Sequence, residues 1–303
     1  MGASRRGLAA LGGDPDRFPP VTTLVCFHAH PDDETTATAG VMAKAAAQGL
    51  RTVLVFGTNG EQGEPVPGVL DEGEPLWQRR IEEAHRSAGV LGVARVEFLG
   101  YEDSGMMGEP ANDNPACFWQ ADVDEAADRL VEILRTEDDV VLTIYDEHGG
   151  YGHPDHIQVH RVGARAAERA GVTQVFQSTM NRDALARQLL DRPPEIADVM
   201  TEEDAAGLQQ QIDEGTFGSP EALITHAVDV SAFIDLKRRS MRAHESQIAP
   251  DSFFLAMPDE PFALAFGTEW FIEHGAVRPP DAPFGSDILN PGDITSATSK
   301  AGD

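Results

Sequence analysis

The chain has 303 residues and a mass of 32.6 kDa, which is enough to bury a core without disulfides or a structural metal. Its 51 acidic and 23 basic residues give a net charge of −28, which disfavours nucleic acid and anionic membrane surfaces as partners. With only two cysteines, the chain is neither a disulfide scaffold nor a four-cysteine zinc module.

Short apolar runs alternate with helical patterns along the first 180 residues. Strands are expected at Thr22–His28, Arg51–Phe56, Val96–Leu99, Val140–Tyr145 and Gln174–Gln177. Helices are expected at Thr35–Gln48, Leu76–Ala88, Asp122–Arg135 and His156–Ala170. Later in the chain we expect a strand at Ala227–Val230 and a helix at Ala232–Gln247. This alternation predicts an α/β fold with a Rossmann-like, mostly parallel sheet and helices on both faces.

The domain organisation follows from where the alternation loosens. We expect one domain over residues 1–278, with a core at 22–190 and a C-terminal elaboration at 191–278. Residues 279–303 are rich in Pro, Gly, Ser and Asp and are expected to form a flexible tail. No stretch approaches about 18 consecutive apolar residues, and no signal peptide is recognisable. We therefore expect a cytoplasmic protein that has no membrane partner.

A first cluster of polar residues follows the first strand, at His28–Glu34. In open α/β sheets, ligands bind beyond the carboxyl ends of strands. His30 and Asp33 are three residues apart, so a helical turn places them on one side, and both are good zinc ligands. Asp32 lies between them and is free to act as a base. The alternative is a loop whose carboxylates only cap the next helix.

A second cluster, Tyr145–His156, also follows a buried strand and opens a helix. One histidine there would be interpreted as a surface or capping residue, but His153 and His156 again stand three apart. Two such clusters favour a mononuclear metal site with three protein ligands and an open position for water. A metal lowers the pKa of water, a carboxylate accepts the proton, and a donor stabilises the oxyanion. The sequence therefore predicts a hydrolase.

Two motifs, Ala29–Glu34 and Gly152–His156, resemble those of the PIG-L/LmbE-like family of metal-dependent N-deacetylases. The similarity extends over residues 22–180. It implies removal of an N-acetyl or other N-acyl group from an amino sugar or related metabolite, such as an N-acetylglucosaminyl pseudodisaccharide. Zn²⁺ is the expected cofactor, with another divalent metal such as Fe²⁺ left open, and a homo-oligomer is also left open.

The resemblance also implies roles for individual residues. The implied metal ligands are His30, Asp33 and His156. Asp32 takes the role of general base, and His153 that of acid or electrostatic partner, oriented by Asp155. Tyr151 resembles a mobile tyrosine that contacts the substrate carbonyl and the developing oxyanion.

Three further residues resemble substrate contacts of the family: Glu64 near the sugar, Arg80 on a hydroxyl or phosphate, and Asp103 in a later loop. For Arg80 the alternative is an ion pair with Glu83 on a solvated helix face. Residues Arg242–Gln247 resemble a late helix of the family that could bring His244 near the site, but we expect His244 at the surface.

Three other functions stay open at this stage. An amidase that acts on a mycothiol S-conjugate would use the same metal chemistry with a different pocket. A non-catalytic metabolite-binding module is disfavoured, because binding alone does not need a spare carboxylate beside a metal. A nucleotide-dependent oxidoreductase is disfavoured because Gly57, Gly60 and Gly63 do not form the dinucleotide-binding pattern.

Overall fold

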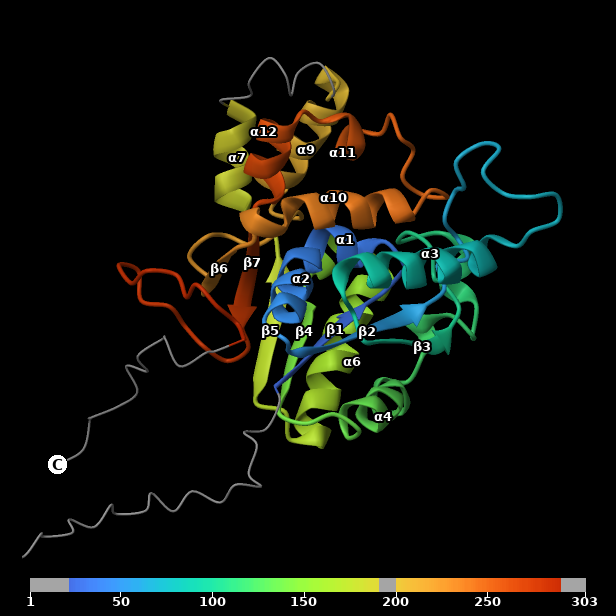
Figure 1. Ribbon diagram of the computed structural model, residues 1–303, viewed down its shortest axis with the longest axis horizontal. Coiled ribbons are helices and arrows are strands. Elements are labelled where there is room, and N and C mark those ends of the chain that lie inside the picture. The colour runs from blue at the N-terminus through green and yellow to red at the C-terminus, as the bar shows by residue number, and fades with distance from the viewer. Residues whose placement is uncertain (1–21, 191–199, 290–303) are drawn as a thin grey trace, which may run out of the picture.

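The computed structural model describes residues 22–190 and 200–289, which form a seven-stranded sheet surrounded by helices (Figure 1). The strand order is β3-β2-β1-β4-β5-β7-β6. Five strands are parallel: β1 (Thr23–His28), β2 (Arg51–Thr58), β3 (Arg95–Tyr101), β4 (Val140–Tyr145) and β5 (Gln174–Thr179). Two antiparallel strands, β7 (Thr268–Glu273) and β6 (His226–Asp229), complete one edge. The predicted mostly parallel α/β fold is confirmed.

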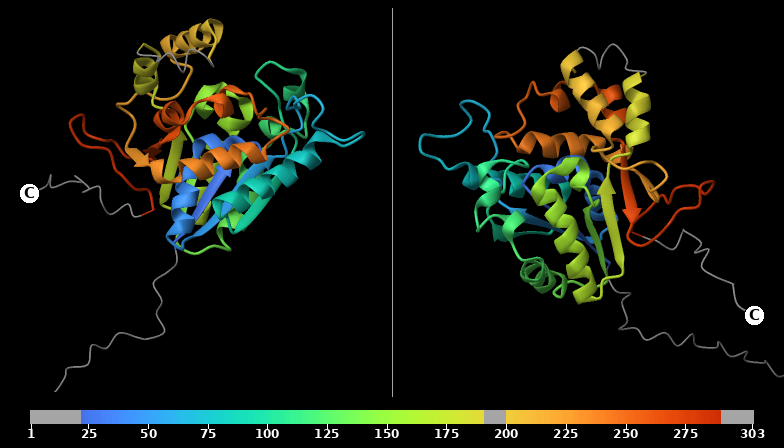
Figure 2. Two further views of the ribbon diagram at one scale, coloured as in Figure 1. Left: turned by 45° about the horizontal axis from the view of Figure 1, so that its top comes forward. Right: turned by 180° about the vertical axis from the view of Figure 1, so that it is seen from behind.

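The two faces of β1 bury alternate side chains against different helices. Val25 and Phe27 join a core with α4 (Val123–Leu134) and α6 (Pro154–Ala170). Leu24 and Cys26 face the opposite way, toward α2 (Ala39–Ala47) and α3 (Leu76–Leu91). All four β1 side chains are completely buried. Helix α10 (Ile234–Ala243) lies beside α3 (Figure 2), so helices cover both faces of the sheet.

The strand order reverses between β1 and β4. The chain runs from β1 outward through β2 to β3, and then returns to place β4 on the other side of β1. Such a switch point opens a crevice beyond the carboxyl ends of the two strands. The two predicted motif clusters follow β1 and β4, so the topology brings them together.

The helix expected at Thr35–Gln48 is interrupted. Helix α1 (Asp33–Ala37) ends at Thr38, whose φ of −141° is not helical, and α2 begins at the next residue. The Thr38 hydroxyl bonds His28 Nε2 at 2.8 Å. The Glu269 carboxylate accepts the amides of Gly40 and Val41 at 2.7 and 2.9 Å, which caps α2.

The C-terminal part continues the same sheet. The aromatic pair Trp270-Phe271 lies within β7. The expectation of a flexible tail from residue 279 is wrong for 279–289, because Ile288 and Leu289 are buried in the core and Gly285 pairs with β6. Residues 290–303 of that tail lie outside the described residues.

The remaining helices are α5 (Gly149–Gly152), α7 (Arg182–Leu190), α9 (Glu202–Glu214), α11 (Phe253–Ala256) and α12 (Asp259–Phe266). Three of them, α7, α9 and α12, gather beyond one end of the sheet (Figure 1). In the described part of the chain, no helix is long and apolar enough to cross a membrane.

Candidate active site

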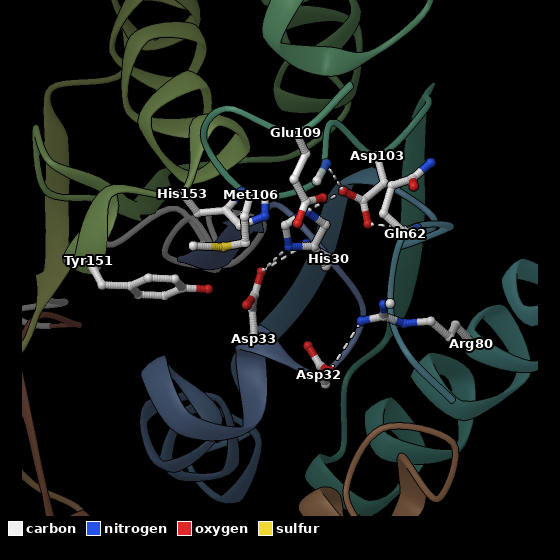
Figure 3. Close-up of a pocket in the computed structure, with 12 residues that line it drawn as sticks. His30, Asp32, Asp33, Gln62, Arg80, Asp103, Met106, Glu109, Tyr151 and His153 are labelled. Carbon is white, nitrogen blue, oxygen red and sulfur yellow. Dashed lines mark hydrogen bonds and ion pairs between the residues drawn. The ribbon is translucent and has the colours of Figure 1, made fainter. Parts of the chain in front are cut away.

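A pocket opens at the carboxyl ends of the strands, and most of the predicted site residues line it (Figure 3). Those that line it are His30, Asp32, Asp33, Arg80, Asp103, Tyr151 and His153. Two others, Asp155 and His156, are buried next to them. Glu64 is exposed on the loop after β2 and does not line the pocket, so the structure does not bring it to the site.

His30 is fixed from both sides of its ring. Its Nε2 lies 3.1 Å from Asp155 Oδ2, and its Nδ1 lies 3.4 Å from Asp33 Oδ2. Asp155 is completely buried, and its carboxylate also accepts the backbone amide and the hydroxyl of Ser104. A carboxylate that receives Nε2–H leaves the lone pair of His30 on Nδ1, facing Asp33.

The contacts of Asp155 differ from those implied by the resemblance. Its carboxylate contacts His30, whereas its contact with His153 is made by the backbone amide, which donates to His153 Nδ1 at 3.1 Å. Because Nδ1 accepts, the proton of a neutral His153 sits on Nε2. Burial, followed by the nearby His30 and His156, lowers the pKa of His153 to about 3, which keeps the ring neutral.

His156 has one nitrogen bonded and one without a partner. Its Nδ1 donates to the Gly149 carbonyl at 3.1 Å. Its Nε2 is buried without a hydrogen-bond partner among the described residues and lies 3.3 Å from Asp33 Oδ1. A buried unpaired nitrogen is costly unless a ligand uses its lone pair.

His30, Asp33 and His156 together fit a divalent metal ion. Two ligand atoms about 2.1 Å from one tetrahedral ion are themselves about 3.4 Å apart. Asp33 Oδ2 lies 3.4 Å from His30 Nδ1, and its other oxygen, Oδ1, lies 3.3 Å from His156 Nε2, so each imidazole nitrogen is at this spacing from one oxygen of the carboxylate. His153 also lies within 4.8 Å of the other two histidines, but its Nε2 carries the proton and cannot ligate in the neutral ring.

A second group, His30, Asp103 and Asp155, is also close enough to hold a metal. The Asp155 oxygens are already engaged by Ser104 and His30. The Asp103 oxygens accept the amides of Gly105 and Gln62. This group therefore serves to hold His30 and the pocket wall, and it is a poorer metal site than the first.

Asp32 has a strained backbone and a carboxylate directed at the pocket. Its φ of 110° lies in a region that costs a residue other than glycine about 1–3 kcal/mol. The Glu34 side chain accepts its amide at 2.9 Å, and Arg80 Nη2 lies 3.1 Å from its Oδ2. Burial raises the pKa of the Asp32 carboxyl to about 6, although the Arg80 guanidinium opposes the shift. A carboxylate of this kind suits proton transfer near neutral pH.

Arg80 is 4% exposed and donates to the backbone carbonyls of Gly60 and Pro31 as well as to Asp32. The alternative of a solvated ion pair with Glu83 is wrong, because the Glu83 side chain is also completely buried. In the structure, the Arg80 guanidinium ties the loop after β2 to the turn that carries Asp32.

Tyr151 is the exposed member of the predicted residues that line the pocket. The residue is 41% exposed, and its ring meets the His156 ring edge-on, with centroids 4.9 Å apart. Its neighbours Gly150 and Gly152 both have positive φ angles, of 76° and 91°, which glycine adopts readily. Figure 3 shows the Tyr151 hydroxyl directed toward Asp33.

Several contributors to the site were not predicted from the sequence. Gln62, Met106 and Glu109 line the pocket from two long loops. Tyr145 stacks on the His156 ring at a centroid distance of 4.6 Å, and its hydroxyl bonds His28 Nδ1 at 2.7 Å. Its position as the first residue of the second cluster was the signal that could have given it a role.

His244, expected at the surface, is completely buried. Its Nε2 donates to Glu34 Oε1 at 2.7 Å. Burial alone would lower the pKa of His244, but the charge of Glu34 raises it above the ordinary value. The surface expectation was wrong because the partner stands 210 residues earlier in the chain.

Comparison with known proteins decides the family. The family described as PIG-L, GlcNAc-PI de-N-acetylase, matches residues 25–167. A protein of Acidothermus cellulolyticus named 1D-myo-inositol 2-acetamido-2-deoxy-alpha-D-glucopyranoside deacetylase is 41% identical over 298 residues. That match covers 92% of this chain and 100% of the relative. The chain belongs to the PIG-L family. The expected membership of a family of N-deacetylases is confirmed.

Solved structures share the fold of this PIG-L protein. The N,N'-diacetylchitobiose deacetylase of Pyrococcus horikoshii has a TM-score of 0.50 and 22% identity, over 82% of each chain. The 4-carboxy-2-hydroxymuconate hydratase of Pseudomonas putida has a TM-score of 0.53 and 18% identity, over 86% of this chain and all of the other. The same fold therefore carries different reactions, and the site has to decide the chemistry.

Proposed function

We propose that the protein is a metal-dependent hydrolase that removes the N-acetyl group from an N-acetylglucosaminyl-inositol pseudodisaccharide. The observation that carries the proposal is the buried Nε2 of His156, which has no hydrogen-bond partner in the described part of the chain and lies beside Asp33 and His30, while Asp32 lines the adjoining pocket. The substrate is inferred from the name of the 41% identical relative.

We assign the metal ligands as His30 Nδ1, a carboxylate oxygen of Asp33, and His156 Nε2. Two imidazoles and one carboxylate suit Zn²⁺, while Fe²⁺ also accepts such ligands, so Zn²⁺ is our first choice of metal. When bound, the metal would supply Lewis-acid activation of water near neutral pH. Asp155 and the Gly149 carbonyl would hold the two imidazoles in the required tautomers.

The remaining roles follow from proton positions. Asp32 would accept the proton of the attacking water, because its carboxylate faces the pocket and its pKa is near 6. His153 Nε2–H would donate to the amide as charge develops. Tyr151, which lies between two glycines with positive φ angles, would contact the substrate carbonyl.

The three proposed substrate contacts differ in the observations that support them. Asp103 is 4% exposed, lines the pocket and is held by two backbone amides, so it can accept hydrogen bonds from sugar hydroxyls. Arg80 lines the pocket, but its bonds to the protein favour a role in holding Asp32. The role of Glu64 depends on the resemblance alone. A cytoplasmic location and a homo-oligomer stay predictions from the sequence.

The alternatives are weaker. The relative's name favours a deacetylase over an amidase for mycothiol S-conjugates. A binding module has no use for a carboxylate with a raised pKa beside a set of metal ligands.

The proposal is tested by incubating the zinc-loaded protein with N-acetylglucosaminyl-inositol, a mycothiol S-conjugate and simple N-acetyl sugars, and measuring free amine. We expect the first substrate to give the highest kcat/KM, and a chelator to abolish turnover until zinc is returned. Preference for the S-conjugate would replace the proposed substrate. Amine release that is insensitive to the chelator would contradict the metal assignment.

A further inference from the structure

One face of helix α3 carries three buried polar residues. Arg80, Glu83 and Ser87 are 4%, 0% and 0% exposed, and their spacing of three and four residues places them on one side of the helix. Burial of such groups is costly unless each has a partner. Arg80 bonds Gly60 in the loop after β2 as well as Pro31 and Asp32, Ser87 bonds Glu34, and Glu83 bonds Ser246. Two distant segments are therefore joined to this face: the turn at residues 31–34 and the residues that follow helix α10.

Glu34 joins these two segments. One of its oxygens, Oε2, accepts the Asp32 amide at 2.9 Å. The other, Oε1, accepts the Ser87 hydroxyl at 2.5 Å and His244 Nε2 at 2.7 Å. Glu34, Ser87 and His244 are all completely buried. A continuous set of hydrogen bonds therefore runs from His244 through Glu34 to the backbone of Asp32.

The segment after α10 also holds the loop that follows β2. Ser246 donates its amide and its hydroxyl to Glu83 at 2.8 and 2.6 Å, and its carbonyl accepts the Val66 amide at 2.8 Å. The Gln247 side chain lies so close to Gly63 that a Cβ there would be 2.4 Å from its Oε1. Gly63 lines the pocket, whereas His244 and Ser246 do not.

We propose that His244 is a positioning residue for the deacetylation, acting through Glu34 to keep the Asp32 turn in its reactive shape. Asp32 has a φ of 110°, and such a conformation persists only where its surroundings fix it. Without the His244 N–H, Glu34 Oε1 keeps only the Ser87 hydroxyl, so the carboxylate that accepts the Asp32 amide is less firmly fixed. The inference rests on the proposed function.

The test compares steady-state kinetics of the zinc-loaded protein with those of His244→Leu, which removes the donor, Glu34→Gln and the double variant. We expect each single variant to lower kcat about 10–100-fold, the effect typical of lost supporting bonds around a reactive group, with KM and zinc content unchanged. Because the two residues act in series, the double variant should lose no more than the worse single variant. A merely structural role would not confine the loss to kcat.

The matched control is His226→Leu. His226 is also completely buried, with Nδ1 bonded to Thr225 Oγ1 at 2.8 Å, but it lies in β6 and does not line the pocket. We expect the kcat of this variant to be unchanged. If His244→Leu does not fold by circular dichroism, Ser87→Ala replaces it, because it removes the other side-chain donor to Glu34 Oε1; the expected loss of kcat is about fivefold.

Each outcome has one interpretation. Full kcat in His244→Leu, or losses that multiply in the double variant, would overturn the positioning role while the enzyme remained active. An equal loss in His226→Leu would do the same, because it would show a general effect of replacing a buried histidine. The proposed function would be wrong if the wild-type protein were inactive on every substrate, or if Asp32→Asn kept full kcat. In either case the positioning role of His244 would be wrong as well.

Discussion

The Lys237–Glu269 pair makes a quantitative prediction about stability. The two side chains are 1% and 3% exposed, and Lys237 Nζ lies 2.7 Å from Glu269 Oε1. Glu269 also accepts the amides of Gly40 and Val41 at the start of α2, so its carboxylate has three donors and Lys237 has one acceptor. Glu269→Gln leaves a buried ammonium without its counter-charge, which costs about 3–5 kcal/mol.

This loss of unfolding free energy predicts a change in melting temperature. At about 2.1 cal/mol/K per residue, unfolding of a chain of 303 residues has an entropy of roughly 0.6 kcal/mol/K, so Glu269→Gln should lower Tm by about 5–8 °C. Lys237→Met should cost less, because the remaining carboxylate keeps its two backbone donors. The double variant should melt above Glu269→Gln, since no isolated charge remains.

Scanning calorimetry of the four proteins, with their metal content matched, measures these differences. A fall in Tm for Lys237→Met that equals or exceeds that of Glu269→Gln would refute the reasoning. So would a double variant that melts below both single variants. The first result would mean that the Gly40 and Val41 amides do not stabilise the unpaired Glu269 carboxylate. The second would mean that an isolated charge is not what destabilises the single variants.

The remaining predictions concern the site. Asp32→Asn should keep its metal while kcat falls about 10²–10⁴-fold, which metal analysis and amine release measure together; full activity would exclude it as the base. His156→Ala should lose the metal, whereas His160→Ala, on the same helix and bonded to the Tyr145 carbonyl, should retain it; equal metal content in both would contradict the ligand set. Asp155→Asn should weaken zinc affinity about 10–100-fold in a chelator competition, and unchanged affinity would show that His30 needs no carboxylate to orient it.

The local sequence pattern was enough to predict the central sheet and the proximity of the two motif clusters that follow β1 and β4. Apolar runs identified β1, β2 and β4, and the rule that ligands bind at strand ends predicted that His30 and His156 lie together, where their ring centroids are 5.4 Å apart. These features depend on neighbours within a few residues, or on topology that the alternation of strands and helices dictates.

The features that sequence reasoning missed depend on distant partners. The break between α1 and α2 needs Glu269, which stands 229 residues from Gly40. His244 looks like a surface residue of a polar helix until Glu34 is placed beside it. Strand β7 is inserted between β5 and β6 against the direction of its neighbour, and no local pattern specifies that order.

The 210-residue separation between Glu34 and His244 has a consequence for how the protein is made. A ribosome adds about 5–20 residues per second, so roughly 10–40 s pass between the synthesis of Glu34 and that of His244. During that interval, the turn at residues 32–34 lacks the histidine that bonds Glu34 in the folded protein. The turn therefore gains this bond only after residue 244 has been made.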